Sequence, residues 1–186
     1  MINGRNCFHP HGEKGFRGPH GIFFSGCRNV TLSGYTICNT GNFMHQPDRC
    51  SNVTFSGVTM LAGHDGAHIN CCDNVLFEGC TIRSGNDCIA GIDTRNVIIR
   101  SCLLNSACNN LRMGASTCLS SIAALSALGY ISAVCPSRMA RTTTCPSPQG
   151  RHNTLCALTY FSSEVYPPSS PGCNWMIKDC TLENID

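Results

Sequence analysis

Charged residues, heptad repeats and metal-binding motifs are scarce or absent in this sequence, and each absence excludes a class of protein. Charged side chains make up 13% of the 186 residues, and the formal net charge is +2. This composition argues against a disordered chain and against the basic surface that binds nucleic acid. There is no Cys-x-x-Cys motif and the histidines are scattered, so no zinc site is indicated. We therefore expect no cofactor, no metal and no nucleic-acid partner.

Signals for secretion and for membrane insertion are also weak. The first residues, MINGR, lead into polar sequence without an apolar run, so they do not form a signal peptide. The protein is then either cytoplasmic or made with a longer N-terminus. Residues 113–137 are uncharged and long enough to span a bilayer, but their serine content and missing aromatic flanks argue against a membrane helix. We expect no membrane association.

Cysteine, in contrast, is abundant, with 16 residues, and glycine numbers 18. Many glycines with few charges favour turns and strands over helices. Secreted disulfide scaffolds use cysteine this heavily, but they are usually shorter and lack long repeats. The alternative is cysteine as a small buried residue with a free thiol. The sequence favours free thiols and leaves disulfides open.

An Asn-Val pair returns along the chain at Asn29, Asn52, Asn74 and Asn96, at spacings of 23, 22 and 22 residues. Apolar residues follow each Asn at +1 and +3, and again at +6 and +8. A period of two predicts strands, and the jump from +3 to +6 predicts a bend. A third strand is predicted before each Asn, with apolar residues at −7 and −5 in most coils. Three short strands per coil of about 22 residues predict an all-β fold, a right-handed single-stranded parallel β-helix.

The alignment of coils also predicts columns of stacked side chains. The repeated Asn is expected to form a ladder at a turn, because Asn tolerates left-handed backbone and its amide can bond to the next coil. Cysteines share two columns, which predicts stacked thiols in the core. These columns contain Cys27, Cys50 and Cys72, and Cys80, Cys102 and Cys180.

The repeat is not equally clear along the single predicted domain, residues 1–186. Regular coils are predicted over residues 4–114 and terminal coils over residues 150–186. Between them, residues 115–149 contain no Asn-Val pair, no strand period and no acidic residue. This segment is interpreted as an irregular insertion or as sequence translated out of frame. Neither end has the cap that a solenoid needs, so we expect a fragment of a longer protein.

Asp65 and Asp87 are the candidate catalytic residues. They are 22 residues apart and occupy the same phase of the repeat, so they are expected on neighbouring coils, ~4.8 Å apart. Two acids held on a rigid wall are suited to breaking a glycosidic bond. The competing interpretation is structural, with Asp65 in an Asx-turn before Gly66 and Asp87 in a turn after Gly85.

The sequences His-Asp-Gly at 64–66 and Gly-Asn-Asp-Cys at 85–88 carry a resemblance to a known family. They are similar to the Asn-Thr-Asp-Gly and Gly-Asp-Asp-Cys motifs of the polygalacturonases, glycoside hydrolase family 28, and of their bacterial parallel β-helix relatives. The resemblance covers roughly residues 4–114 and again 150–186. It implies that Asp65 and Asp87 are the two aspartates that activate water in an inverting hydrolysis.

The resemblance also shows departures from the family pattern. The family's proton donor corresponds to Asn86, whose amide has no acidic proton to give to the leaving oxygen. The histidine of the family's Gly-His-Gly motif corresponds to Asn109, and the Arg-x-Lys motif has no counterpart in the chain. We expect the remaining polar residues of this wall to bind substrate, and His68 and Arg112 could bind a uronate carboxylate. The predicted substrate-binding residues are His64, His68, Asn86, Asn109 and Arg112.

The predicted function is hydrolysis of the α-1,4-galacturonide bonds of pectin by a polygalacturonase-type enzyme, impaired by Asn86 and by the missing histidine motif. Two alternatives stay open. One is a calcium-dependent pectate lyase, another parallel β-helix. The other is a non-catalytic β-helix that binds glycans or serves as a structural rod. In each case the expected partner is a polysaccharide or oligosaccharide, and the expected state is a monomer.

Overall fold

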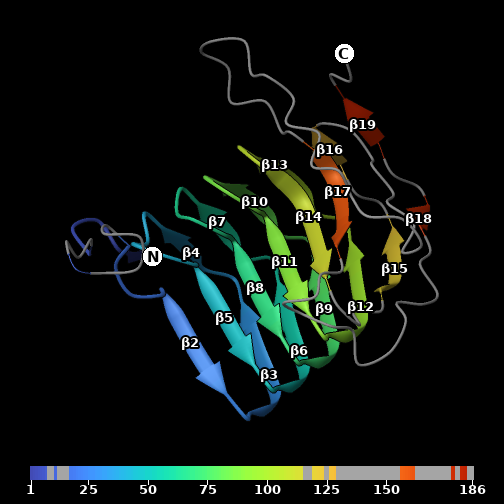
Figure 1. Cartoon of the computed structure of the whole chain (residues 1–186), viewed down its shortest axis with the longest axis horizontal. Coiled ribbons are helices and arrows are strands. Elements are labelled where there is room, and N and C mark those ends of the chain that lie inside the picture. The colour runs from blue at the N-terminus through green and yellow to red at the C-terminus, as the bar shows by residue number, and fades with distance from the viewer. Residues whose placement is uncertain are drawn as a thin grey trace.

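The computed structural model describes residues 1–7, 11 and 17–114 and five short strands beyond them. All regular structure in these residues is β-strand, and the strands wind into a solenoid of three parallel sheets (Figure 1). Successive strands belong to different sheets, so each sheet gains one strand per coil. This arrangement confirms the predicted all-β solenoid with three short strands in each coil.

The three sheets are named A, B and C. Sheet A has the order β1 (Ile2–Asn3), β4 (Thr36–Cys38), β7 (Thr59–Leu61), β10 (Thr81–Ser84), β13 (Leu103–Ser106), β16 (Ser126–Leu128) and β19 (Thr181–Glu183). Sheet B has the order β2 (Ile22–Ser25), β5 (His45–Asp48), β8 (Ala67–Asn70), β11 (Ile89–Ile92), β14 (Asn109–Gly114) and β17 (Cys156–Phe161). Sheet C has the order β3 (Arg28–Ser33), β6 (Ser51–Ser56), β9 (Asp73–Glu78), β12 (Arg95–Arg100), β15 (Leu119–Ala123) and β18 (Ile177–Lys178).

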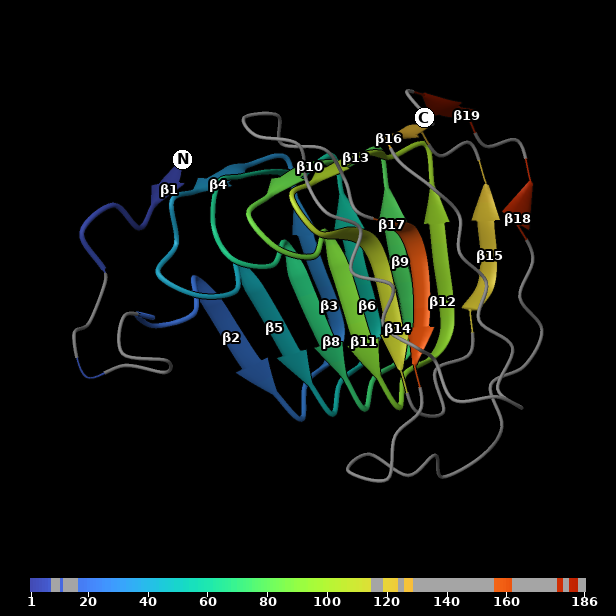
Figure 2. The same cartoon turned by 45° about the horizontal axis from the view of Figure 1, so that its top comes forward.

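Pairing between coils follows the predicted repeat of about 22 residues. In sheet B, Ile89 pairs with Ala67 on one side and with Leu111 on the other, and all three side chains are buried. Figure 2 shows the strands of this sheet lying side by side along the solenoid. Because each residue pairs with its equivalent one coil away, the sequence columns become real stacks of side chains.

The core lies between the three sheets and is built from these stacks. Phe55 and Phe77 are fully buried at equivalent positions of β6 and β9, and their rings stack with centroids 4.5 Å apart. Burying one such side chain stabilises the fold by about 1.5–3 kcal/mol. The repeated apolar positions therefore supply the main driving force for coiling.

The Asn ladder is present at the corner between sheets B and C. Asn52 donates from Nδ2 to Asn29 Oδ1 at 2.8 Å, and Asn74 donates to Asn52 Oδ1 at 2.7 Å. Each of these residues has a φ between 54° and 59°, the left-handed conformation that Asn tolerates. The ladder changes at Asn96, which donates to Asp73 Oδ1 at 2.8 Å.

The ten cysteines from Cys7 to Cys108 are free thiols. Cys50 and Cys72 are buried at the same corner, and each thiol donates to the carbonyl two residues earlier, at 3.2 Å. Thr94 takes the next place in this column and donates from Oγ1 to Ile92 O at 3.1 Å. A small side chain with one weak donor therefore suits this corner, which accounts for the repeated cysteine. Cys180 lies outside the described residues.

Beyond Gly114, β15 to β19 extend the three sheets by pairing in parallel with earlier strands. The other residues of segments 115–149 and 150–186 lie outside the described part, so their division and the shifted reading frame stay predictions. Within the residues that the structure describes, no helix has the length and hydropathy of a membrane span.

Candidate active site

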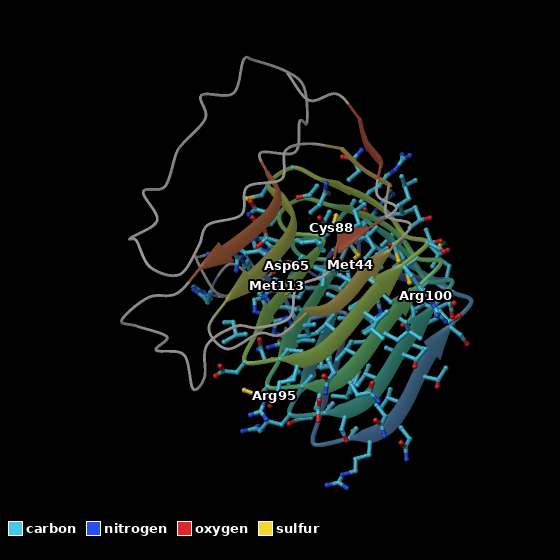
Figure 3. The ribbon with its side chains drawn as sticks, turned by 90° about the vertical axis from the view of Figure 1, so that its right-hand side faces the viewer. Met44, Asp65, Cys88, Arg95, Arg100 and Met113 are labelled. Atoms are coloured by element: carbon cyan, nitrogen blue, oxygen red, sulfur yellow. The ribbon has the colours of Figure 1, made fainter. Side chains whose placement is uncertain are left out.

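The predicted site lies at the corner where sheet A passes into sheet B. Asp65 precedes β8 and Asp87 precedes β11, on neighbouring coils that are joined by a hydrogen bond from Gly66 N to Asp87 O at 2.9 Å. Gly66 is required here, since a Cβ would approach Cys88 O to 2.5 Å. The two carboxylates thus stack in one column, as the repeat predicts. Figure 3 places Asp65 away from Arg95 and Arg100, the ends of β12.

Asp65 is the most heavily hydrogen-bonded side chain of the site and is only 2% exposed. Its Oδ1 accepts from His64 Nδ1 at 2.9 Å, from Asn86 Nδ2 at 2.8 Å and from the backbone N of Asp87 at 3.3 Å. Its Oδ2 accepts from His68 Nδ1 at 2.9 Å. Burial raises the pKa of the Asp65 carboxyl, but the hydrogen bonds from His64, His68 and Asn86 outweigh it and hold the pKa far below its usual value. Asp65 is therefore an ionised carboxylate.

Asp87 is buried equally deeply, at 1% exposure, but it has fewer donors. Its Oδ1 accepts from Asn109 Nδ2 at 2.8 Å and from the Asn109 backbone N at 3.3 Å. Its Oδ2 accepts no hydrogen bond from the described residues, and Arg112 Nη1 lies 3.6 Å away. Burial and the neighbouring charge of Asp65 raise the pKa of Asp87, against the hydrogen bonds from Asn109 and the charge of Arg112. The two carboxyl groups therefore differ in basicity, and Asp87 binds a proton more readily.

Every predicted site residue belongs to this cluster. His64, His68 and Asn86 contact Asp65, while Asn109 and Arg112 contact Asp87. The structure brings the seven residues together at one corner.

Sequence reasoning missed two residues that complete the cluster. Arg17 is 6% exposed and its Nη2 contacts His64 Nε2. Phe43 lies in the same column as Asp65, one coil earlier, and its ring stacks on His68 with centroids 4.4 Å apart at 18°. A column count could have found Phe43, whereas Arg17 precedes the first Asn-Val pair and carries no periodic signal.

Cys88 follows Asp87 and could be read as a nucleophile, but its surroundings argue against this. The thiol is fully buried and donates towards Ile82 O at 3.5 Å. Burial raises the pKa of Cys88 to about 12, so the reactive thiolate is suppressed at neutral pH. Cys88 is a core thiol of the turn. Among the described residues, no three His, Cys, Asp or Glu side chains are grouped as ligands for a metal ion.

These features define a class of protein, the parallel β-solenoid with stacked carboxylates at one corner. The comparisons with known proteins place the chain within that class. The family model of glycosyl hydrolases family 28 matches residues 4–110, which is more than half of the chain, so the chain belongs to this family. The match includes the whole corner up to Asn109. Searches of curated proteins and of solved structures found no match.

Proposed function

We propose that this corner binds a galacturonide polysaccharide and hydrolyses its glycosidic bond with inversion, at a reduced rate. Family membership supports a polygalacturonase-like glycoside hydrolase acting on a polysaccharide. The observation that carries the proposal is the pair of stacked carboxylates. Both oxygens of Asp65 accept hydrogen bonds, whereas Oδ2 of Asp87 accepts none from the described residues and faces only the charge of Arg112. Pairs of acids whose surroundings displace their pKa values in opposite directions are typical of acid–base catalysis.

Asp87 is the candidate base. Its buried Oδ2 accepts no hydrogen bond from the described residues and lies 3.6 Å from Arg112 Nη1, so movement of Arg112 onto a substrate would leave this oxygen to accept a proton from an attacking water. The raised pKa makes the ionised form a stronger base than an ordinary aspartate. Asp65 keeps its negative charge and can stabilise the positive charge that develops on the sugar ring.

Arg112 is the candidate group for substrate recognition. Its side chain is 46% exposed and lies beside Asp87. A guanidinium can bind the carboxylate of a uronate through two parallel hydrogen bonds. This would place a galacturonate residue directly over the candidate base, and it favours an acidic polysaccharide over a neutral one.

Asn86 limits the rate. Its Nδ2 donates to Asp65 Oδ1, so the side chain belongs to the site but supplies no acidic proton. General-acid catalysis contributes typically about 10²–10⁴-fold. The chain is therefore expected to turn over slowly, and the Asn86→Asp variant is expected to gain activity by up to that factor.

The test is reducing-end release from polygalacturonate, with the anomer of the product followed by proton NMR. The unmodified chain, Asn86→Asp and Asp87→Asn are compared, with Arg95→Gln as a control far from the site. Slow release of the inverted anomer, accelerated in Asn86→Asp and lost in Asp87→Asn, would support the proposal. Binding without cleavage in every variant would favour the glycan-binding alternative. An unsaturated product that absorbs ultraviolet light and requires calcium would favour the lyase.

A further inference from the structure

We propose that His68 supplies the proton that Asn86 cannot, so that its Nε2 protonates the leaving oxygen of the glycosidic bond. The inference rests on the proposed function of the same site. It identifies a second group for the reaction, and it starts from a difference between two histidines. His64 and His68 flank the same carboxylate, and both donate to it from Nδ1 at 2.9 Å.

His64 is held between Arg17 and Asp65. A guanidinium has donors only, so in the contact between Arg17 Nη2 and His64 Nε2 the imidazole nitrogen must accept. The ring proton of neutral His64 is then on Nδ1, where it donates to Asp65 Oδ1. A second proton on Nε2 would collide with the guanidinium donor. His64 is therefore a fixed bridge between the charges of Arg17 and Asp65.

His68 is anchored only on one side. Its Nδ1 donates to Asp65 Oδ2, and none of the hydrogen bonds of the described residues uses its Nε2. The side chain is 20% exposed, whereas the carboxylate beneath it is 2% exposed. Phe43 stacks on the ring and fixes its plane. His68 therefore presents a free nitrogen at the surface of the site, directly above an ionised carboxylate.

A negative charge lies against the anchored side of the His68 ring. Asp65 is negative and stabilises an imidazolium that is bonded to it, as the aspartate does for histidine in catalytic triads. Imidazole is also the side chain that exchanges protons between pH 5 and 8. Among the described residues, the other titratable and charged groups near this ring are His64 on its own turn, Asp87 and Arg112 on the following coils, and Arg17 and His20 before β2.

The register of sheet B places His68 correctly for this role. His68 pairs with Ala90 and Ala90 pairs with Arg112, so the three outward positions form one column. Arg112 and His68 are thus two coils apart, ~10 Å along the solenoid, with the short side chain of Ala90 between them. A uronate held at Arg112 would extend its glycosidic bond towards His68.

The proposed step conserves protons and electrons. His68 Nε2–H protonates the glycosidic oxygen while the bond from that oxygen to the anomeric carbon breaks, and its electron pair stays on the oxygen. A water oxygen bonds to the anomeric carbon and gives one proton to the Asp87 carboxylate. Solvent then carries a proton from Asp87 back to His68. One water molecule is consumed, and the products are a free hydroxyl and a hemiacetal.

The first experiment compares substrates with poor and good leaving groups. His68→Gln, His64→Gln and the unmodified chain are assayed on polygalacturonate and on 4-nitrophenyl α-galacturonide, whose leaving group needs little protonation. We expect His68→Gln to lose about 10²-fold or more on polygalacturonate and far less on the aryl substrate. Adding Asn86→Asp to His68→Gln should restore polygalacturonate cleavage. Equal losses of His68→Gln on both substrates, or no loss, would overturn the inference.

The second experiment does not depend on turnover. Nitrogen-15 NMR of the imidazoles in the unliganded chain identifies which ring nitrogens carry a proton under the conditions of the assay. The proposal requires a proton on Nε2 of His68 and a single proton, on Nδ1, of His64. A proton on Nε2 of His64 beside a bare Nε2 of His68 would contradict the assignment. If neither the unmodified chain nor Asn86→Asp cleaves either substrate, the proposed function fails, and the NMR result still decides which histidine carries the proton.

Discussion

Two corners of each coil differ in how their side chains are stacked from one coil to the next. At the corner between sheets B and C, the chain repeats one residue, and Asn52 and Asn74 each bond to their equivalent in the previous coil. At the corner between sheets A and B, the column changes with every coil, from Phe43 to Asp65, Asp87 and Asn109. The first corner is stabilised by repetition. The second corner can carry chemistry because it stacks unlike groups at the spacing of neighbouring strands.

The largest effect on the free energy of unfolding is expected at Asp65, the most heavily hydrogen-bonded residue of the corner between sheets A and B. Asp65→Asn removes a buried charge that accepts from two histidines, Asn86 and a backbone N–H, so it should lower the free energy of unfolding by about 3 kcal/mol or more. Urea denaturation at pH 7 measures the change. The matched control is Asp87→Asn one coil away, because the raised pKa of Asp87 means that its ionised form is disfavoured in the folded state. Asp87→Asn should leave the stability unchanged or raise it, and equal losses in both variants would contradict the contrast.

The pH dependence of the same residue follows from linkage. The folded pKa of Asp65 lies below its unfolded value, so its contribution to stability is present at neutral pH and is lost as the pH falls below the usual aspartate range. Unfolding free energies of the unmodified chain and of Asp65→Asn should converge as the pH falls from the usual aspartate pKa towards the lower folded pKa of Asp65.

A second prediction concerns His45, a departure from the apolar pattern inside the core. The ring is fully buried beside Phe55 and bonds through Nε2 to Tyr35 at 2.6 Å. Burial lowers the pKa of His45 to about 4, so the folded state excludes a proton that the unfolded chain binds below pH ~6.5. Stability should fall as the pH drops from 6.5 towards 4, by about 3 kcal/mol in total.

The variant His45→Leu should remove that loss, because leucine fits a column that already holds Ile22 and Ala67. Thermal denaturation at pH 7 and at pH 4.5 measures the difference. The double variant His45→Leu/Tyr35→Phe is the control, because His45→Leu alone leaves the Tyr35 hydroxyl without its hydrogen-bond partner. An unchanged acid sensitivity in both variants would show that other groups cause it.

The smallest effect is expected at the repetitive corner. Asn74→Ala removes one exposed hydrogen bond of 2.7 Å and places a Cβ residue at a φ of 59°, so it should cost about 1–2 kcal/mol. Asn74→Gly relieves the backbone and should cost only the hydrogen bond. Denaturant unfolding separates the two, and polygalacturonate cleavage should be unchanged in both. A larger loss of stability in Asn74→Gly than in Asn74→Ala would show that the left-handed backbone is not the main cause of the loss.

The sequence predicts the coil and its columns well, because inward positions repeat with a fixed period and Asn marks one turn of every coil. It therefore places Asp65 above Asp87 correctly. It does not predict the contact between Arg17 and His64, which joins residues 47 positions apart outside the repeat. Nor does it predict that Asn86 turns its amide towards Asp65, since the orientation of a side chain depends on its neighbours in three dimensions. The roles of the seven site residues stay predictions.

Pairing of each strand only with its equivalents one coil away has a consequence for how such a chain diversifies. Insertion or deletion of one unit of about 22 residues leaves every remaining strand paired in register. It nevertheless places a different side chain next to each carboxylate. Substrate specificity can therefore change by the gain or loss of whole coils, while the sheets that support the site stay intact.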